Sequence, residues 1–168
     1  MSSERSSAPA VRIERELDAP VEDVWRMWTD PVSFESWYGP PGATIIVAAM
    51  ELHVGGDRRV RMDMMTPRGP MTMWFTGQHQ EIIENSRLVY SESMSDESGN
   101  ALTAAAAGLP PDHPTETTVT VELTSTATRP RAGTRLTLTH EGIPAGSPGE
   151  AGWKAALGKL TACLLAGT

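Results

Sequence analysis

Two of the four histidines in this 168-residue chain are predicted to face an apolar interior. His79 shares a strand face with Phe75 by alternation, and His140 shares one with Leu136 and Leu138. A histidine in such a place can bind a ligand oxygen or act as a general acid or base, because its pKa lies near neutrality. His79 and His140 are therefore the candidate catalytic residues. The structural alternative is a histidine at a strand end whose hydrogen bonds are made by backbone or water.

Other familiar reaction centres are not supported by the sequence. The histidines lie far apart and without metal-ligand spacing, so no metal site is predicted from His53, His79, His113 and His140. The chain has no G-x-S-x-G motif, P-loop or G-x-G-x-x-G motif, and no cofactor is expected. The single cysteine, Cys163, is predicted to be a packing residue of the terminal helix rather than a nucleophile.

Residues 58–82 predict a hairpin with one face rich in methionine. If Thr66 pairs with Gly69, alternation places six residues on that face: Val60, Met62, Met64, Met71, Met73 and Phe75. Methionine is flexible and polarizable, so this face either adapts to a bound molecule or fills core space in a chain with only two phenylalanines. A thioether Cu(I) site is a third possibility, disfavoured because no His or Cys lies at ligand spacing nearby.

Two further residues are expected near the mouth of such a pocket. Arg58, on the methionine side, would either anchor a ligand carboxylate or extend its charged group into solvent. Trp37 stands beside the bend "YGPPG" and is predicted to form part of the pocket rim. Trp25 and Trp28 are expected to pack the early helices against the sheet and the terminal helix.

The elements that would position these residues follow from periodicity and from breaking residues. Pro20 is predicted in the first turn of a helix that ends before Pro31, and Asp30 is predicted to cap a second short helix. Alternation predicts strands in 11–17, 43–56, 58–82 (a hairpin), 86–93, 117–128 and 134–142. Residues 94–116 are predicted to be a long loop, either a lid or a tolerated insertion.

The C-terminal segment 150–167 is predicted to be an amphipathic helix. Its apolar stripe carries Trp153, Leu157, Leu160 and Leu164. This helix is the only predicted element long enough to cover the dry face of the sheet. Residues 1–10 are predicted to be a disordered arm and residues 11–168 a single domain.

Composition limits the function classes. The net charge of −7 and a sequence pI near 5.1 argue against a nucleic-acid partner. The chain has neither the run of ~20 apolar residues needed for a membrane span nor an apolar signal core. A single cysteine excludes an internal disulfide, which is typical of a cytoplasmic protein.

Five segments carry a resemblance to a known family: "LDAPVEDVWRMWTDPVSFESWYGPPG", "HVGGDRRVRM", "FTGQHQEI", "TRLTLTHEGIP" and "GWKAALGKL". Together they resemble the domain family named for the activator of the 90-kDa heat-shock protein ATPase. This family is part of the START/SRPBCC (helix-grip, Bet v allergen-like) superfamily. The resemblance implies an α+β fold: a curved seven-stranded antiparallel sheet, two short helices after the first strand, a long C-terminal helix over the sheet and an internal cavity.

The chain departs from the pattern of this family at four positions. His53 stands where arginine is common, Arg58 and Val60 stand where aromatic residues are usual, and His79 replaces a further aromatic residue. These differences imply a more polar or differently shaped pocket.

The leading hypothesis is a stand-alone domain that binds a small hydrophobic or amphipathic molecule, a role that needs no catalysis. The predicted ligand-binding residues are Trp37, Arg58, Val60, Met62, Met64, Met71, Met73, Phe75, His79, Trp153 and Leu157. A cyclase or dehydratase would use His79 or His140 as acid–base and Arg58 as an anion anchor. A co-chaperone or protein-interaction module would instead expose a contiguous apolar patch. Homodimerisation through an edge strand or Trp74 is a further possibility.

Overall fold

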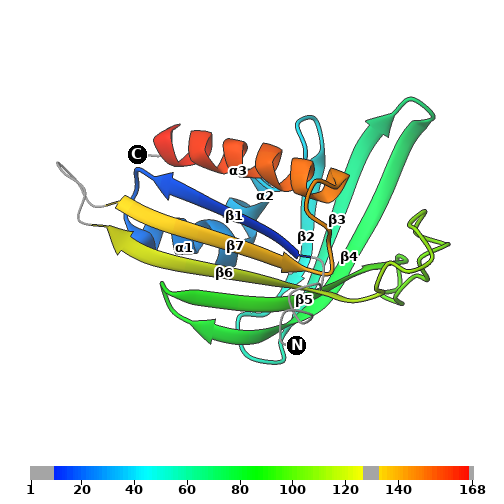
Figure 1. Cartoon of the computed structure of the whole chain (residues 1–168), viewed down its shortest axis with the longest axis horizontal. Coiled ribbons are helices and arrows are strands. Elements are labelled where there is room, and N and C mark those ends of the chain that lie inside the picture. The colour runs from blue at the N-terminus through cyan, green and yellow to red at the C-terminus, as the bar shows by residue number, and fades with distance from the viewer. Residues whose placement is uncertain (1–9, 127–132, 167–168) are drawn as a thin grey trace, which may run out of the picture.

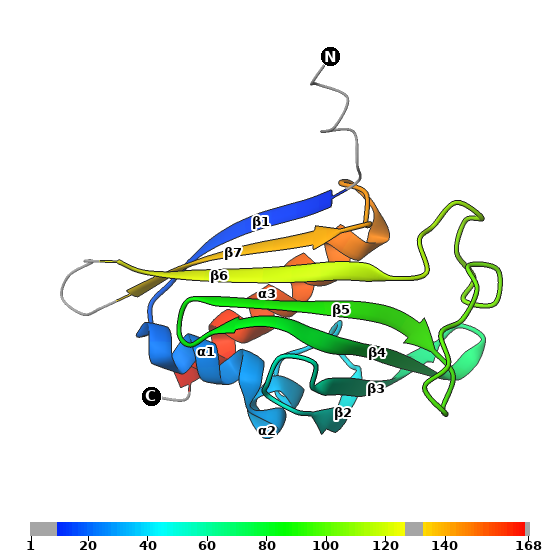
Figure 2. The same ribbon diagram turned by 90° about the horizontal axis from the view of Figure 1, so that it is seen from below.

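Seven antiparallel strands form one curved sheet that wraps around a long C-terminal helix (Figures 1 and 2). The computed structural model describes residues 10–126 and 133–166. The strand order is β1-β7-β6-β5-β4-β3-β2. The elements are β1 Ala10–Leu17, α1 Val21–Thr29, α2 Pro31–Glu35, β2 Thr44–Met50, β3 Asp57–Thr66, β4 Gly69–Ile83, β5 Arg87–Ser95, β6 Thr117–Thr126, β7 Gly133–Glu141 and α3 Pro148–Ala166. This is the predicted helix-grip fold.

The predicted N-terminal arm, 1–10, lies outside the described residues except for Ala10, which begins β1. None of the helices within 10–126 and 133–166 combines the length and the apolar character that crossing a bilayer requires.

The β3–β4 hairpin has the register that alternation predicts. Thr66 faces Gly69, and three further pairs follow: Met64 with Met71, Met62 with Met73, and Val60 with Phe75. The hairpin projects beyond α3 (Figure 1). Its tip is therefore only partly covered.

The boundaries of the two early helices lie at or next to the predicted signals. The Asp30 side chain accepts a hydrogen bond from the backbone N–H of Ser33 (2.9 Å) and so caps α2. Pro20 is the residue immediately before α1 and not part of its first turn, while Glu22 and Asp23 occupy that turn. Trp25 and Trp28 thus lie on the buried face of α1.

Five aromatic side chains hold the helices together. Trp28 of α1 lies 4.6 Å from Trp37 and 6.0 Å from Trp153 of α3, measured between ring centroids. Phe34 and Tyr38 of the α2 region stack at 4.6 Å and extend the group. We call Trp28, Phe34, Trp37, Tyr38 and Trp153 the aromatic cluster. The predicted packing of Trp28 against the terminal helix is confirmed, and Trp25 is buried in the same core.

Glycine at position 77 of β4 is required by a close strand approach. A Cβ there would lie 1.8 Å from the Ser91 carbonyl oxygen on β5. Gly77→Ala is therefore expected to lower the free energy of unfolding by roughly 1–3 kcal/mol, the usual cost of overpacking. Urea denaturation followed by circular dichroism would measure it.

Gly158→Ala on α3 is the matched control. A Cβ at Gly158 meets no atom within 4 Å, so this change should raise the stability by up to about 1 kcal/mol through helix propensity. Equal effects at the two positions would contradict the role given to Gly77.

Candidate functional site

A cavity of about 240 Å³ lies between the sheet, the N-terminal half of α3 and the loop 96–116. Its wall is mostly apolar, with a few polar side chains. The lining residues are Tyr38, Gly39, Pro40, Met62, Phe75, Glu92, Ser93, Met94, Leu102, Thr103, Ala104, Ala107, Leu109, His113, Pro114, Thr115, Thr117, His140, Ile143, Gly149, Gly152, Trp153 and Ala156.

The structure brings four of the predicted site residues together at this cavity: Met62, Phe75, Trp153 and His140. The other predicted site residues lie outside the described lining: Trp37, Arg58, Val60, Met64, Met71, Met73, His79 and Leu157. Val60 and Leu157 are fully buried and pack in the core. Their predicted faces are correct, but the space next to them is filled.

Trp37 does not form the predicted rim. Its side chain is completely buried within the aromatic cluster, and its indole N–H donates a hydrogen bond to the Met27 carbonyl oxygen at 2.7 Å. The neighbouring residue, Tyr38, takes the position at the cavity wall. The bend after α2 therefore places tyrosine, and not tryptophan, next to the cavity.

The methionine face continues out of the cavity along the hairpin. Met62 is buried at the cavity wall, and Met64 and Met73 pack partly buried against the core. Met71 is 46% exposed, because the hairpin extends past the elements that could cover it. Only the inner end of the predicted methionine wall thus meets the cavity, where Met94 of β5 joins it.

Arg58 neither lines the described cavity nor extends into solvent. The residue is 3% exposed, and its guanidinium carbon lies 3.6 Å from the Tyr90 ring centroid and 5.4 Å from that of Phe34. A guanidinium over an aromatic face is attracted by the ring quadrupole. The predicted pocket-mouth position of Arg58 is wrong, because its side chain turns inward and places the guanidinium against the Tyr90 ring.

His79 is an inward-facing core residue. It is 1% exposed, and its Nδ1 lies 2.7 Å from the Glu51 carbonyl oxygen. A carbonyl only accepts, so Nδ1 carries the proton and Nε2 is unprotonated. Burial, assisted by the charge of Arg58, lowers the pKa of His79 to about 4. The structural alternative for this histidine, a backbone hydrogen bond, matches its surroundings.

His140 belongs to a hydrogen-bond chain that starts on α3. The Trp153 indole N–H donates to His140 Nδ1 at 2.9 Å, and an indole can only donate. The proton of the neutral ring therefore sits on Nε2, which donates to the Thr117 hydroxyl at 2.8 Å. Thr117 in turn donates to the Glu92 carbonyl oxygen at 3.2 Å. Burial lowers the pKa of His140 to about 4, in keeping with this neutral form.

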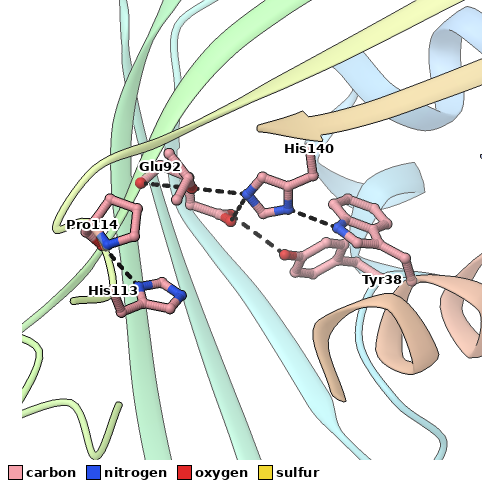
Figure 3. A network of polar contacts seen from close by, with 7 residues as sticks. Tyr38, Glu92, His113, Pro114 and His140 are labelled. Atoms are coloured by element: carbon pink, nitrogen blue, oxygen red, sulfur yellow. Dashed lines mark hydrogen bonds and ion pairs between the residues drawn. The ribbon is translucent and has the colours of Figure 1, made fainter. Parts of the chain in front are cut away.

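Glu92 is the polar side chain that sequence reasoning missed. Figure 3 shows its carboxylate between His140 and Tyr38. Oε2 accepts a long hydrogen bond from the Tyr38 hydroxyl (3.4 Å), and Oε1 lies 3.8 Å from His140 Nε2. Burial raises the pKa of the Glu92 carboxyl, while the charge of Arg58 opposes the shift. Burial also raises the pKa of Tyr38 well above its usual value, so its hydroxyl stays protonated.

Strand alternation could have identified Glu92. It follows Leu88 and Tyr90 on one face of β5, and both of these are buried. No comparable pattern marks the loop 96–116, which supplies eight lining residues from Leu102 to Thr115. Along the described parts of the chain, no group of three or more His, Cys, Asp or Glu side chains is placed to hold a metal ion.

Acidification is expected to destabilise the fold through the two buried histidines. Their pKa falls from 6.5 to about 4 on folding, so below pH 6.5 the unfolded chain binds protons that the folded protein does not. Each histidine then removes up to ~1.4 kcal/mol of stability per pH unit between these values. The raised pKa of Glu92 has the opposite effect on stability, because on acidification the folded protein binds this one proton before the unfolded chain does.

Thermal unfolding at about pH 7.5 and about pH 5 would measure this loss of stability. His140→Gln and His79→Asn keep hydrogen-bonding groups near Nε2 and Nδ1 but do not titrate. Each variant should show a smaller drop in Tm than the unmodified protein. An equal drop in all three would contradict neutral buried histidines.

Comparison with known proteins agrees with this architecture. Protein CV1439 from Chromobacterium violaceum has a similar structure, with a TM-score of 0.70 and 24% identity over 92% of this chain and 96% of that one. A protein from Arthrobacter aurescens has a TM-score of 0.71 and 26% identity over 95% of this chain and 87% of that one. The AHSA1 protein SPO3351 from Silicibacter pomeroyi has a TM-score of 0.69 and 18% identity over 95% of this chain and 99% of that one. No curated protein matches this chain in sequence. The family model described as "Activator of Hsp90 ATPase homolog 1-like protein" matches residues 18–165. Because this match spans most of the chain, the protein belongs to that family.

Proposed function

We propose that this protein binds a small hydrophobic or amphipathic molecule in the cavity. The observation that carries the proposal is a mostly apolar space of about 240 Å³ in which the polar groups of Tyr38, Glu92 and His140 lie close together. Small-molecule sites typically combine an apolar lining with a few placed polar groups, in volumes of roughly 300–1,000 Å³. The volume here favours a compact ligand.

A histidine-dependent cyclase or dehydratase is less well supported. His79 lies outside the described cavity lining, and both ring nitrogens of His140 already have hydrogen-bond partners. Proton transfer to a ligand would rest on Glu92 instead, whose buried carboxyl has a raised pKa. Such an activity is the second candidate function.

A co-chaperone or protein-interaction role rests on the family name alone. Among the described residues, the large exposed apolar side chains are spread over six segments: Val32, Ile46, Leu52 with Val54, Met65 with Met71, Ile83, and Leu165. A protein-binding patch is usually contiguous. Homodimer formation and a cytoplasmic location stay predictions, as does a lid function of residues 94–116, of which the first two belong to β5 in the structure.

Filling the cavity from α3 tests the binding function. Gly152 lines the cavity, and a Cβ there meets no atom within 4 Å, so Gly152→Leu should extend a side chain into the ligand space. We expect at least a tenfold weaker affinity for the neutral fluorescent probe N-phenyl-1-naphthylamine, measured by fluorescence titration.

Gly158→Leu is the matched control on the same helix, because Gly158 is exposed and lies outside the described lining. It should bind the probe like the unmodified protein. If Gly152→Leu also binds it unchanged, the cavity is not the binding site.

A further inference from the structure

The carboxylate of Glu92 is buried with too few partners. Glu92 is 9% exposed, and an ionised carboxyl can accept about four hydrogen bonds. Within the described residues, Oε2 accepts one long hydrogen bond, from the Tyr38 hydroxyl at 3.4 Å, and Oε1 accepts none. Burying a carboxylate is costly unless donors surround it. Oε1 is thus available to a hydrogen-bond donor in the cavity.

The side chains around Oε1 do not supply that donor, since none of His140, Thr117 and Arg58 donates a hydrogen bond to it. The His140 Nε2 proton is directed to Thr117, and the Thr117 hydroxyl donates to the Glu92 backbone, so both donors are in use. Arg58 has its guanidinium against Tyr90 and lies outside the described lining.

The cavity also lacks a strong cation to receive an anionic ligand. Among the described lining residues there is no lysine or arginine. His113 lines the cavity, but its Nδ1 hydrogen-bonds the Pro114 carbonyl oxygen at 2.9 Å (Figure 3). Since a carbonyl only accepts, that bond uses the Nδ1 proton of the ring. A ligand carboxylate at this wall would meet the negative charge of Glu92 instead.

We infer that the polar end of the ligand is a hydrogen-bond donor (an alcohol, a phenol or an amine) rather than a carboxylate, and that Glu92 is the residue that selects it. This inference rests on the proposed binding function and adds the chemistry of the head group. The ligand donor would occupy Oε1, with the apolar body against Met62, Phe75 and Trp153. Specificity of this kind arises because a ligand without the donor leaves a buried acceptor unpaired.

Three probes with one apolar body test the inference: 2-naphthol, 2-methoxynaphthalene and 2-naphthoate. Calorimetric titration at about pH 8 measures the three affinities. We expect 2-naphthol to bind at least tenfold more tightly than either of the other two. In Glu92→Gln, the preference for naphthol over naphthoate should fall at least fivefold, because an amide presents no charge to the anion.

Glu141→Gln is the control, since it removes one negative charge from an exposed position on β7. It should keep the preference of the unmodified protein. If naphthoate or methoxynaphthalene binds as tightly as naphthol, the inference about the head group is wrong while cavity binding stands. If none of the probes binds, both proposals are wrong.

Discussion

The hydrogen bond from Trp153 to His140 connects the terminal helix to the sheet and sets the chemistry of the cavity. It joins α3 to β7, and the chain of donors then passes through Thr117 of β6 to Glu92 of β5. Each donor in this series is fixed by the one before it, since an indole can only donate. The position of the helix thus decides which nitrogen of His140 carries a proton and leaves the Glu92 carboxylate without that donor.

Apolar packing makes this polar chain possible. The aromatic cluster places Trp153 between Trp28 and Tyr38, with ring centroids 6.0 Å and 5.7 Å away. Hydrogen bonds strengthen in a low-dielectric interior, and an unpaired polar group there becomes expensive for the same reason. The cavity wall therefore combines a well-paired histidine with a poorly paired carboxylate.

Much of the fold could be predicted from the sequence, because alternation and breaking residues act locally. The pairing of Thr66 with Gly69 fixed the hairpin register, and Leu136 and Leu138 placed His140 on the inner face. The cavity could not be predicted in the same way. His79 faces inward as expected and Arg58 is buried instead of at the pocket mouth, yet the open space lies farther along the sheet, where α3 and the loop 96–116 leave a gap.

Glu92 was missed for a different reason. Glutamate is rarely buried, so the residue type favours a solvent-exposed side chain at a position where strand alternation favours a buried one. A polar residue whose strand pattern points inward is therefore the more informative signal. The loop carried no signal at all, since its alanines, glycines and prolines have no periodicity that relates them to the sheet.

The pairing of β1 with β7 has a consequence for how the protein is made. Ala10 pairs with Glu141 and Leu17 with Thr134, so β1 obtains this partner only after the strands between them and β7 itself have left the ribosome. Until then the early tryptophans have no terminal helix to pack against. Contacts so distant in sequence slow folding and leave apolar surface exposed in the meantime. The nascent chain is thus most open to misassembly just before β7 and α3 emerge.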